Sequence, residues 1–212
     1  LMAGSAIDLQ AAGERANALL LTWYPGARGG RTAADILFGR VSPSGKLPVT
    51  FYRNEQLAQM PEFTDYSMRG RTYRYLEQEP LYPFGYGLSY SEFEISDLSV
   101  SCKNIEYNAL KNGKNVNVSV KVKNVSGRDG AEVVQLYIRD RVASMTRPLR
   151  ELRGVKKVFV RAGETETADF EIDFRALGFY GADKKFDVEK GRFEIYVGNS
   201  CYADLAAEVE VI

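Results

Sequence analysis

The second half of the chain alternates apolar and polar residues, and this pattern constrains the fold more than any other feature of the sequence. The alternation is clearest at residues 116–122 (VNVSVKV), 133–138 and 193–197. Successive side chains of a strand point to opposite faces, so the pattern indicates strands with one buried face. Seven strands are predicted, at residues 94–101, 115–125, 132–140, 152–160, 165–174, 191–198 and 205–212. Turn signals such as Asn112-Gly113 and Ala162-Gly163 separate several of them, which favours an antiparallel β-sandwich of immunoglobulin or fibronectin type III character.

The N-terminal part has a different pattern. Residues 18–24 (ALLLTWY) form a continuous apolar run that ends at Pro25-Gly26, which is typical of a strand buried on both faces in a parallel sheet. A helix is predicted at residues 31–38, opened by Gly29-Gly30 and ended by Gly39, and an extended segment at 47–51. These elements predict part of a parallel α/β layer.

Residues 52–90 are rich in Tyr, Arg, Pro and Gly and predict a long loop segment. The change of pattern near Tyr90 predicts two domains. The first, residues 1–90, is the end of an α/β domain with its connecting aromatic segment, and the second, residues 91–212, is the sandwich. The predicted fold class is α+β: a partial α/β layer followed by an antiparallel β-sandwich.

Composition excludes several classes of function. Lys plus Arg and Asp plus Glu both number 28, so no net charge favours nucleic acid or an anionic membrane. The absence of histidine removes Ser-His-Asp and Cys-His catalysis and the commonest transition-metal ligand. Cys102 and Cys201 are interpreted as buried free thiols rather than as a disulfide, and no metal site is predicted.

The beginning of the chain has neither an initiating Met nor the basic start of a secretion signal, and no apolar run approaches the roughly 20 residues of a membrane span. We expect the original N-terminus to lie upstream of Leu1. Export therefore stays open between the cytoplasm, the periplasm and secretion.

Four groups of motifs resemble one known family. Residues 23–30 (WYPGARGG), 33–39 (AADILFG) and 43–51 (PSGKLPVTF) have the order and spacing of the second domain of family 3 glycoside hydrolases. Residues 83–90 (PFGYGLSY) are similar to the segment that precedes the fibronectin type III-like domain of that family. Further similar strings run from residues 135–137 (QLY) through Pro148 and occur at 152–154 and 191–194. Residues 70–75 (GRTYRY) look more like the β-xylosidase members than the commonest β-glucosidases. By this resemblance the chain is identified as a C-terminal portion.

The resemblance implies a retaining exo-β-glycosidase that removes terminal glucose or xylose without a metal or organic cofactor. Retaining enzymes use two carboxyl groups about 5 Å apart. In this family the Asp nucleophile lies on a preceding (β/α)8 barrel and the Glu acid/base early in the second domain, so both are expected upstream of Leu1. No catalytic residue is assigned here, the substrate-binding residues stay unknown, and the fragment is expected to be inactive while it braces the active-site domains.

The loop segment contains the local groups that offer an alternative site. Its acids are Glu62, Asp65, Glu77 and Glu79, for which we favour ion pairs with Arg69, Arg71 and Arg74 over catalysis. Its aromatic residues are Tyr66, Tyr73, Tyr75, Tyr82, Phe84, Tyr86 and Tyr90. They are interpreted as packing between domains rather than as faces for sugar stacking, because a tyrosine buries its ring and still bonds its hydroxyl. We also expect Arg71 and Arg74 to stack on rings or to pair with acids.

Two other patterns have a structural interpretation. The glycines at 26, 29 and 30 lack the Lys-Ser/Thr of a phosphate loop and indicate a tight turn. The charged run at residues 147–157, with Glu151 as its one acid, is interpreted as a solvated strand or loop, with a partner-binding patch as the alternative.

Competing functions remain: a carbohydrate- or protein-binding sandwich without hydrolase activity, and a fragment that complements a separately made barrel domain. The expected partners are β-linked glucosides or xylosides, through the parent enzyme, and the barrel domain. The preferred sugar and the oligomeric state, including a homo-oligomer, stay open.

Overall fold

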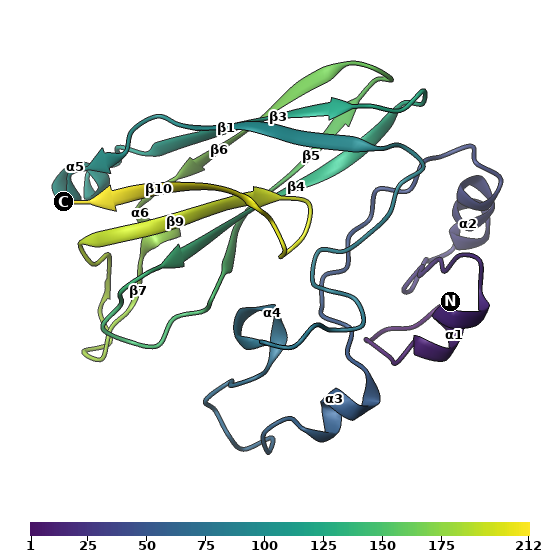
Figure 1. Cartoon of the computed structure of the whole chain (residues 1–212), viewed down its shortest axis with the longest axis horizontal. Coiled ribbons are helices and arrows are strands. Elements are labelled where there is room, and N and C mark those ends of the chain that lie inside the picture. The colour runs from purple at the N-terminus through teal and green to yellow at the C-terminus, as the bar shows by residue number, and fades with distance from the viewer. The chain divides into compact units, whose positions relative to one another are not determined.

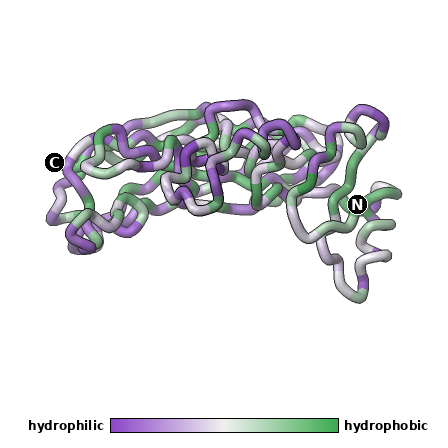
Figure 2. Tube along the Cα trace, turned by 90° about the horizontal axis from the view of Figure 1, so that it is seen from below, coloured by the Kyte–Doolittle hydropathy of each residue, from purple (hydrophilic) through white to green (hydrophobic).

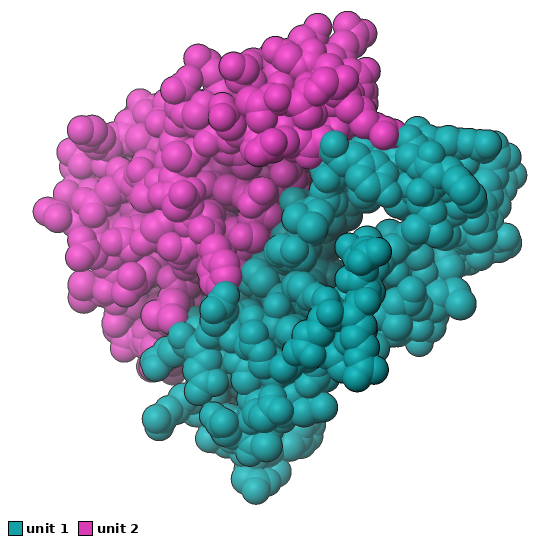
Figure 3. Space-filling view, turned by 45° about the vertical axis from the view of Figure 1, so that its right-hand side comes forward, with its two compact units in different colours: residues 1–90 teal, residues 91–212 magenta.

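The computed structural model describes residues 1–212 and divides them into two compact units, Leu1–Tyr90 and Ser91–Ile212 (Figure 3). The second unit contains all the strands of the chain that form ladders (Figure 1). The first contains short helices and one isolated β-bridge.

The second unit is a β-sandwich. One sheet has three strands in the order β1-β3-β6, and the other has five in the order β2-β10-β9-β4-β5. The strands are β1 (Phe93–Val100), β2 (Asn104–Ile105), β3 (Val116–Asn124), β4 (Gly130–Asp140), β5 (Glu151–Val160), β6 (Thr165–Ile172), β9 (Gly191–Gly198) and β10 (Leu205–Val211). A separate hairpin pairs β7 (Phe179–Tyr180) with β8 (Phe186–Asp187), and the short helices are α5 (Tyr107–Lys111) and α6 (Phe174–Leu177). The seven predicted strands are confirmed as β1, β3, β4, β5, β6, β9 and β10, and the predicted sandwich with them.

The sandwich core follows from the period-2 pattern. Every second residue of β3 from Val116 to Val122 is buried, and its neighbours in sequence face outward. Along the whole chain, hydrophilic and hydrophobic stretches follow each other at short intervals (Figure 2). The inner faces of both sheets and the two short helices together form one hydrophobic cluster. Except for β2, which pairs parallel to β10, neighbouring strands of both sheets are antiparallel.

In the first unit the predicted helix is confirmed as α2 (Gly29–Leu37). The helix begins two residues earlier than predicted, because Gly29 and Gly30 belong to it. Gly29 approaches Pro25 so closely that a Cβ on Gly29 would lie 2.5 Å from the proline Cβ. Gly39 ends the helix with φ +71°, a conformation that favours glycine. The unit also contains α1 (Gln10–Arg15), α3 (Asn54–Ala58) and α4 (Thr72–Tyr75).

The strand predicted at residues 18–24 is not formed in this chain. A strand needs neighbouring strands that bond to its backbone N–H and C=O groups. In this chain only Leu1 forms such hydrogen bonds with residues 18–24. Its amino group donates to the Leu20 carbonyl at 2.9 Å, and its carbonyl accepts from the Thr22 N–H at 3.0 Å. One residue that bonds to both neighbours of Leu21 has the hydrogen-bond pattern of a parallel pair.

Residues 47–51 run antiparallel to residues 82–86, with a bend at residues 48–49 in place of a continuous extended segment. The Leu47 N–H donates to the Tyr86 carbonyl at 2.8 Å, and Phe51 and Tyr82 exchange two backbone hydrogen bonds. Gly87 then passes so close to Gly45 that a Cβ on Gly87 would lie 2.1 Å from the Gly45 carbonyl oxygen. The motifs at residues 43–51 and 83–90 therefore pack backbone against backbone.

Candidate functional site

The aromatic residues of the first unit form a chain of ring contacts around Phe51. Trp23 meets the Phe51 ring edge-on at 6.4 Å, and Phe51 meets the Tyr82 ring at 6.3 Å. Tyr82 stacks on Tyr86 with their centroids 5.3 Å apart. Tyr82 and Tyr86 thus pack on other rings of the first unit, and packing between domains, which we favoured for these tyrosines, stays a prediction.

A second stack lies further along the loop segment. Tyr73 stacks on Phe84 at 4.4 Å, and the Arg74 guanidinium lies 6.0 Å from the Tyr73 centroid. The stacking expected for Arg74 is therefore confirmed. Tyr75 is partly buried, and the Tyr90 hydroxyl donates to the Ile36 carbonyl at 2.9 Å.

Residues 62–69 present two aromatic rings to solvent. The exposed fractions of Phe63 and Tyr66 are 89% and 90%. The Arg71 guanidinium holds the start of this loop, because its Nη2 donates to the carbonyls of Pro61 and Glu62, each at 2.7 Å. This loop, residues 62–69, is hereafter the aromatic loop.

The acids of the loop segment are exposed, and their ion pairs with Arg69, Arg71 and Arg74 stay a prediction. The Arg71 guanidinium binds backbone carbonyls, as described above, and its charge and that of Arg69 also act on Asp65. Hydrogen bonds from the backbone and hydroxyl groups of Ser67 lower the pKa of Asp65. That carboxyl therefore holds its proton less readily than a free aspartate, whereas a general acid needs the opposite shift.

Backbone strain accompanies the start of α4. Thr72 has φ +55°, which is unusual for a β-branched residue. Its N–H donates to the Tyr52 hydroxyl at 2.6 Å, and burial of that hydroxyl raises the pKa of Tyr52. The phenol therefore stays protonated over the neutral range while it holds the strained turn.

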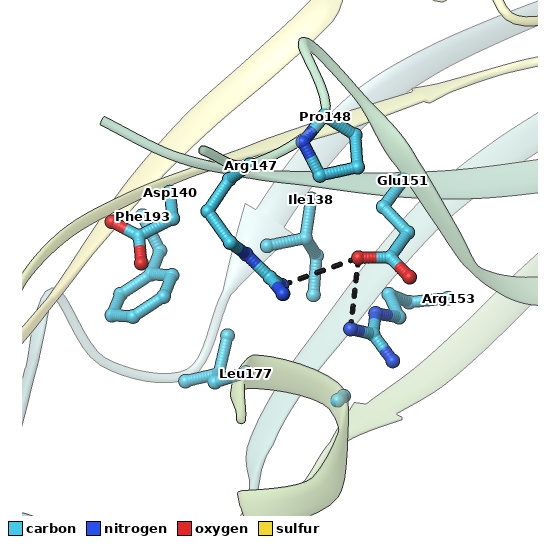
Figure 4. A pocket seen from close by; sticks show the side chains of 9 residues that line it. Ile138, Asp140, Arg147, Pro148, Glu151, Arg153, Leu177 and Phe193 are labelled. Atoms are coloured by element: carbon cyan, nitrogen blue, oxygen red, sulfur yellow. Dashed lines mark hydrogen bonds and ion pairs between the residues drawn. The ribbon is translucent and has the colours of Figure 1, made fainter. Parts of the chain in front are cut away.

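The second unit contains a small pocket at the end of the sandwich, between β4, β5, β9 and α6 (Figure 4). The residues that line it are Ile138, Asp140, Arg147, Pro148, Glu151, Arg153, Ala176, Leu177 and Phe193. In this pocket Glu151 Oε2 accepts from Arg147 Nη2 at 3.2 Å and from Arg153 Nη2 at 2.9 Å (Figure 4). The Arg147 guanidinium also lies 4.6 Å from the centroid of the Phe179 ring.

These contacts correct the interpretation of residues 147–157 as solvated for three side chains, whereas Lys156 and Lys157 of the same run are exposed. The side chains of Arg147, Glu151 and Arg153 are only 18%, 17% and 23% exposed. The apolar Leu149 and Val155 point outward instead. The three charged side chains are mostly buried because the Glu151 carboxylate neutralises both guanidinium groups.

Asp140 is the site residue that the sequence did not indicate. Burial raises the pKa of its carboxyl, and the charge of Glu189 adds to this, while a backbone hydrogen bond from Val142 and the charge of Arg147 act against it. An aspartate at the end of an alternating strand is common, so the sequence holds no signal that distinguishes it.

The pocket is too small for a sugar. Its cavity volume is about 10 Å³, which is about the room that one water needs. Asp140 and Glu151 line the same pocket, but the arginines hold Glu151, and a pyranose does not fit between the two acids.

The structure holds no group of three or more Cys, Asp or Glu side chains with metal-binding geometry. Both cysteines are free, Cys201 buried and Cys102 partly buried. None of the helices has the length and apolar character to cross a membrane.

Comparison with known proteins agrees with the two units. Residues 1–90 match the glycosyl hydrolase family 3 C-terminal domain, and residues 132–201 match a fibronectin type III-like domain. The chain is 40% identical to a periplasmic beta-glucosidase of Salmonella typhimurium over 210 residues, which is 93% of this chain and 26% of that protein. It is 42% identical to a xylan 1,4-beta-xylosidase of Xylanibacter ruminicola over 198 residues, 93% of this chain and 22% of that protein.

Solved structures show the same likeness. A beta-glucosidase from Listeria innocua in complex with glucose superposes with a TM-score of 0.83 at 36% identity, over 99% of this chain and 30% of that one. A family 3 beta-glucosidase from Bifidobacterium adolescentis gives 0.86 at 32% identity, over 99% of this chain and 32% of that one. The chain thus spans about a quarter of the length of the curated relatives named above, and it belongs to glycoside hydrolase family 3, as a C-terminal portion with a fibronectin type III-like domain.

Proposed function

We propose that this chain is the non-catalytic C-terminal portion of a retaining exo-β-glycosidase that hydrolyses terminal β-linked glucose or xylose, and that it braces the domains that carry the catalytic carboxyl groups. Residues 1–90 are then the end of the α/β domain with its connecting aromatic segment, and residues 91–212 form the fibronectin type III-like domain. The relatives that support this include both β-glucosidases and a β-xylosidase at similar identity. The β-xylosidase-like residues 70–75 keep xylose among the expected sugars.

The observation that carries the bracing role is the apolar surface of α2. Its C-terminal residue Leu37 is 67% exposed, and the adjoining Phe38 is 82% exposed. Adjacent exposed apolar residues of this size are typical of a surface that contacts another protein surface. The parallel hydrogen bonds of Leu1 beside Leu21 support a sheet to which further strands add.

The experiment separates catalysis from bracing. The purified chain should show no turnover of aryl β-glucosides or aryl β-xylosides, and the full-length parent should hydrolyse at least one of them. In the parent, Phe38→Ala should lower the melting temperature, whereas Tyr180→Ala, an exposed residue of the sandwich unit, serves as the matched control. Turnover by the purified chain would contradict the non-catalytic role, and equal melting temperatures for both variants would contradict the bracing role.

A second candidate function is supported by the aromatic loop. Exposed aromatic rings on a backbone that Arg71 holds offer flat faces for stacking on a pyranose, and the rings of Phe63 and Tyr66 are the most exposed aromatic side chains of the chain. Calorimetry with xylo- and cello-oligosaccharides tests this function. Heat at millimolar ligand that disappears in Phe63→Ala and Tyr66→Ala supports it, and no heat with the wild-type chain rejects it.

A further inference from the structure

The small pocket of the sandwich contains two buried polar atoms of opposite hydrogen-bonding character that no other group of the chain satisfies. Asp140 Oδ2 is an acceptor and Arg147 Nε is a donor, and both lack a hydrogen-bond partner. The other oxygen of Asp140 accepts a 3.3 Å hydrogen bond from the Val142 N–H, and Arg147 Nη2 bonds to Glu151. A buried polar atom without a partner costs roughly 1–3 kcal/mol, so native structures rarely leave one unsatisfied.

The charges around the pocket restrict what can satisfy both atoms. Asp140 and Glu151 are acids, and Arg147 and Arg153 are bases, so the lining has no net charge. An anion would lie against the two carboxylates, and a cation against the two guanidinium groups. The ligand that fits is neutral, donates one hydrogen bond and accepts another.

The size of the pocket restricts the ligand further. The space of about 10 Å³ matches the room for a single water and excludes any larger hydroxyl or amide compound. We propose that one water molecule binds in this pocket, donates a hydrogen bond to Asp140 Oδ2 and accepts one from Arg147 Nε.

This water joins the end of β4 to the segment that leads into β5. Asp140 is the last residue of β4, and Arg147 lies in the connection at residues 141–150 (Figure 4). Arg147 already contacts Glu151 and the Phe179 ring. The water adds a contact between Arg147 and β4. Both Nε and Nη2 of the guanidinium then have a hydrogen-bond partner. A bound donor also stabilises the ionised form of Asp140, whose pKa burial raises.

A crystal structure of the 212-residue chain at a resolution that shows ordered waters tests the proposal directly. We expect one density peak within about 2.7–3.2 Å of both Asp140 Oδ2 and Arg147 Nε. An empty pocket, or a peak that contacts neither atom, would overturn the proposal.

Oxygen-17 relaxation dispersion of water in solution gives an independent test. Asp140→Leu removes the acceptor and should lower the number of long-lived waters by one per chain. Asp140→Asn keeps an oxygen in place and should leave that number unchanged. Because Asp140→Leu could fail to fold, Arg147→Met removes the donor from the other side and should lose the same water. A wild-type count that matches both Arg147→Met and Asp140→Leu would reject the site.

Discussion

The two units of the chain differ in how many of their apolar side chains are buried. In residues 91–212 the inner faces of two sheets cover each other and form one cluster of buried Val, Leu, Ile and Phe. In residues 1–90 only Leu9 and Phe51 are buried hydrophobic residues, while large side chains such as Leu37, Phe38 and Leu88 are exposed. One unit contains its own core, and the other does not.

This difference shows which interactions stabilise each unit. Burial of apolar surface contributes about 25 cal/mol per Å², so a sandwich with a closed core supplies this term from its own residues. The first unit relies on ring stacking and on backbone hydrogen bonds between residues 47–51 and 82–86. Its exposed apolar side chains are typical of a surface that contacts another protein surface.

The largest effect is expected from the sandwich core. Phe193 is 1% exposed in β9, and Phe193→Ala should cost about 3–5 kcal/mol of unfolding free energy, because it removes a buried ring and leaves a cavity. Phe38→Ala, the matched change at an exposed phenylalanine of the first unit, should change the unfolding free energy of the chain by less than about 0.5 kcal/mol.

Two optical probes separate the units in this test. The one tryptophan of the chain, Trp23, lies in the first unit against Phe51, so its fluorescence reports that unit. The far-ultraviolet circular dichroism of β-structure reports the sandwich. Urea denaturation should move the dichroism midpoint of Phe193→Ala more than the fluorescence midpoint. A cost for Phe38→Ala as large as that for Phe193→Ala would remove the contrast between the units.

A smaller effect is expected where the first unit packs backbone against backbone. In Gly87→Ala the new methyl group would lie 2.1 Å from the Gly45 carbonyl oxygen, so the chain must shift, at about 1–3 kcal/mol. Gly45→Ala is the matched control, because a Cβ at Gly45 meets open space. The fluorescence midpoint of Trp23 should fall for Gly87→Ala and stay unchanged for Gly45→Ala. Equal midpoints would show that the close approach contributes nothing.

The same contrast explains how far the sequence predicts the fold. Period-2 alternation is local, and it indicated all seven long strands of the sandwich because each strand buries one face within the unit. The apolar run at residues 18–24 indicated a strand by the same physics, yet only Leu1 bonds to it. A strand is defined by its neighbours, and an apolar run does not say which residues those neighbours are.

The site was harder to predict than the fold. Ring stacking of Tyr82 and Tyr86 follows from the general behaviour of tyrosine, whereas the preference of Arg71 for backbone carbonyls depends on the path of the loop. The burial of Arg147 and Arg153 depends on Glu151 lying between them, which needs the three-dimensional contact. Charge counts along a sequence contain no such information.

The two units should also respond oppositely to pH. Burial raises the pKa of Asp140 above the ordinary aspartate value of 3.8, so its contribution to stability is present below that pH and is lost as pH rises through the folded-state pKa. Hydrogen bonds from Ser67 lower the pKa of Asp65, so its contribution is present above pH 3.8 and is lost as pH falls through the folded-state pKa.

Asparagine variants measure these two contributions. The stability of the wild-type chain relative to Asp140→Asn should decrease from pH 3 to neutral pH, and its stability relative to Asp65→Asn should increase over the same range. Urea denaturation at several pH values, followed by dichroism for Asp140 and by Trp23 fluorescence for Asp65, provides both series. Slopes of the same sign would contradict the difference in environment between the two carboxyl groups.

The smallest effect is expected from the exposed ion pairs on the five-stranded sheet. Glu194 and Glu208 lie directly opposite each other on β9 and β10, and Arg141 bonds to both, at 3.5 and 3.6 Å. Arg141→Ala removes the one guanidinium that bonds to both glutamates, while Arg139 still pairs with Glu194 and Arg192 with Glu208, so it should cost about 0.5–1 kcal/mol. Arg139→Ala removes a partner of Glu194 alone and should cost less. In 1 M salt, where charges are screened beyond roughly 3 Å, the difference between the two variants should shrink. A difference that persists in 1 M salt would mean that Arg141 acts through packing of its side-chain stem across the two strands.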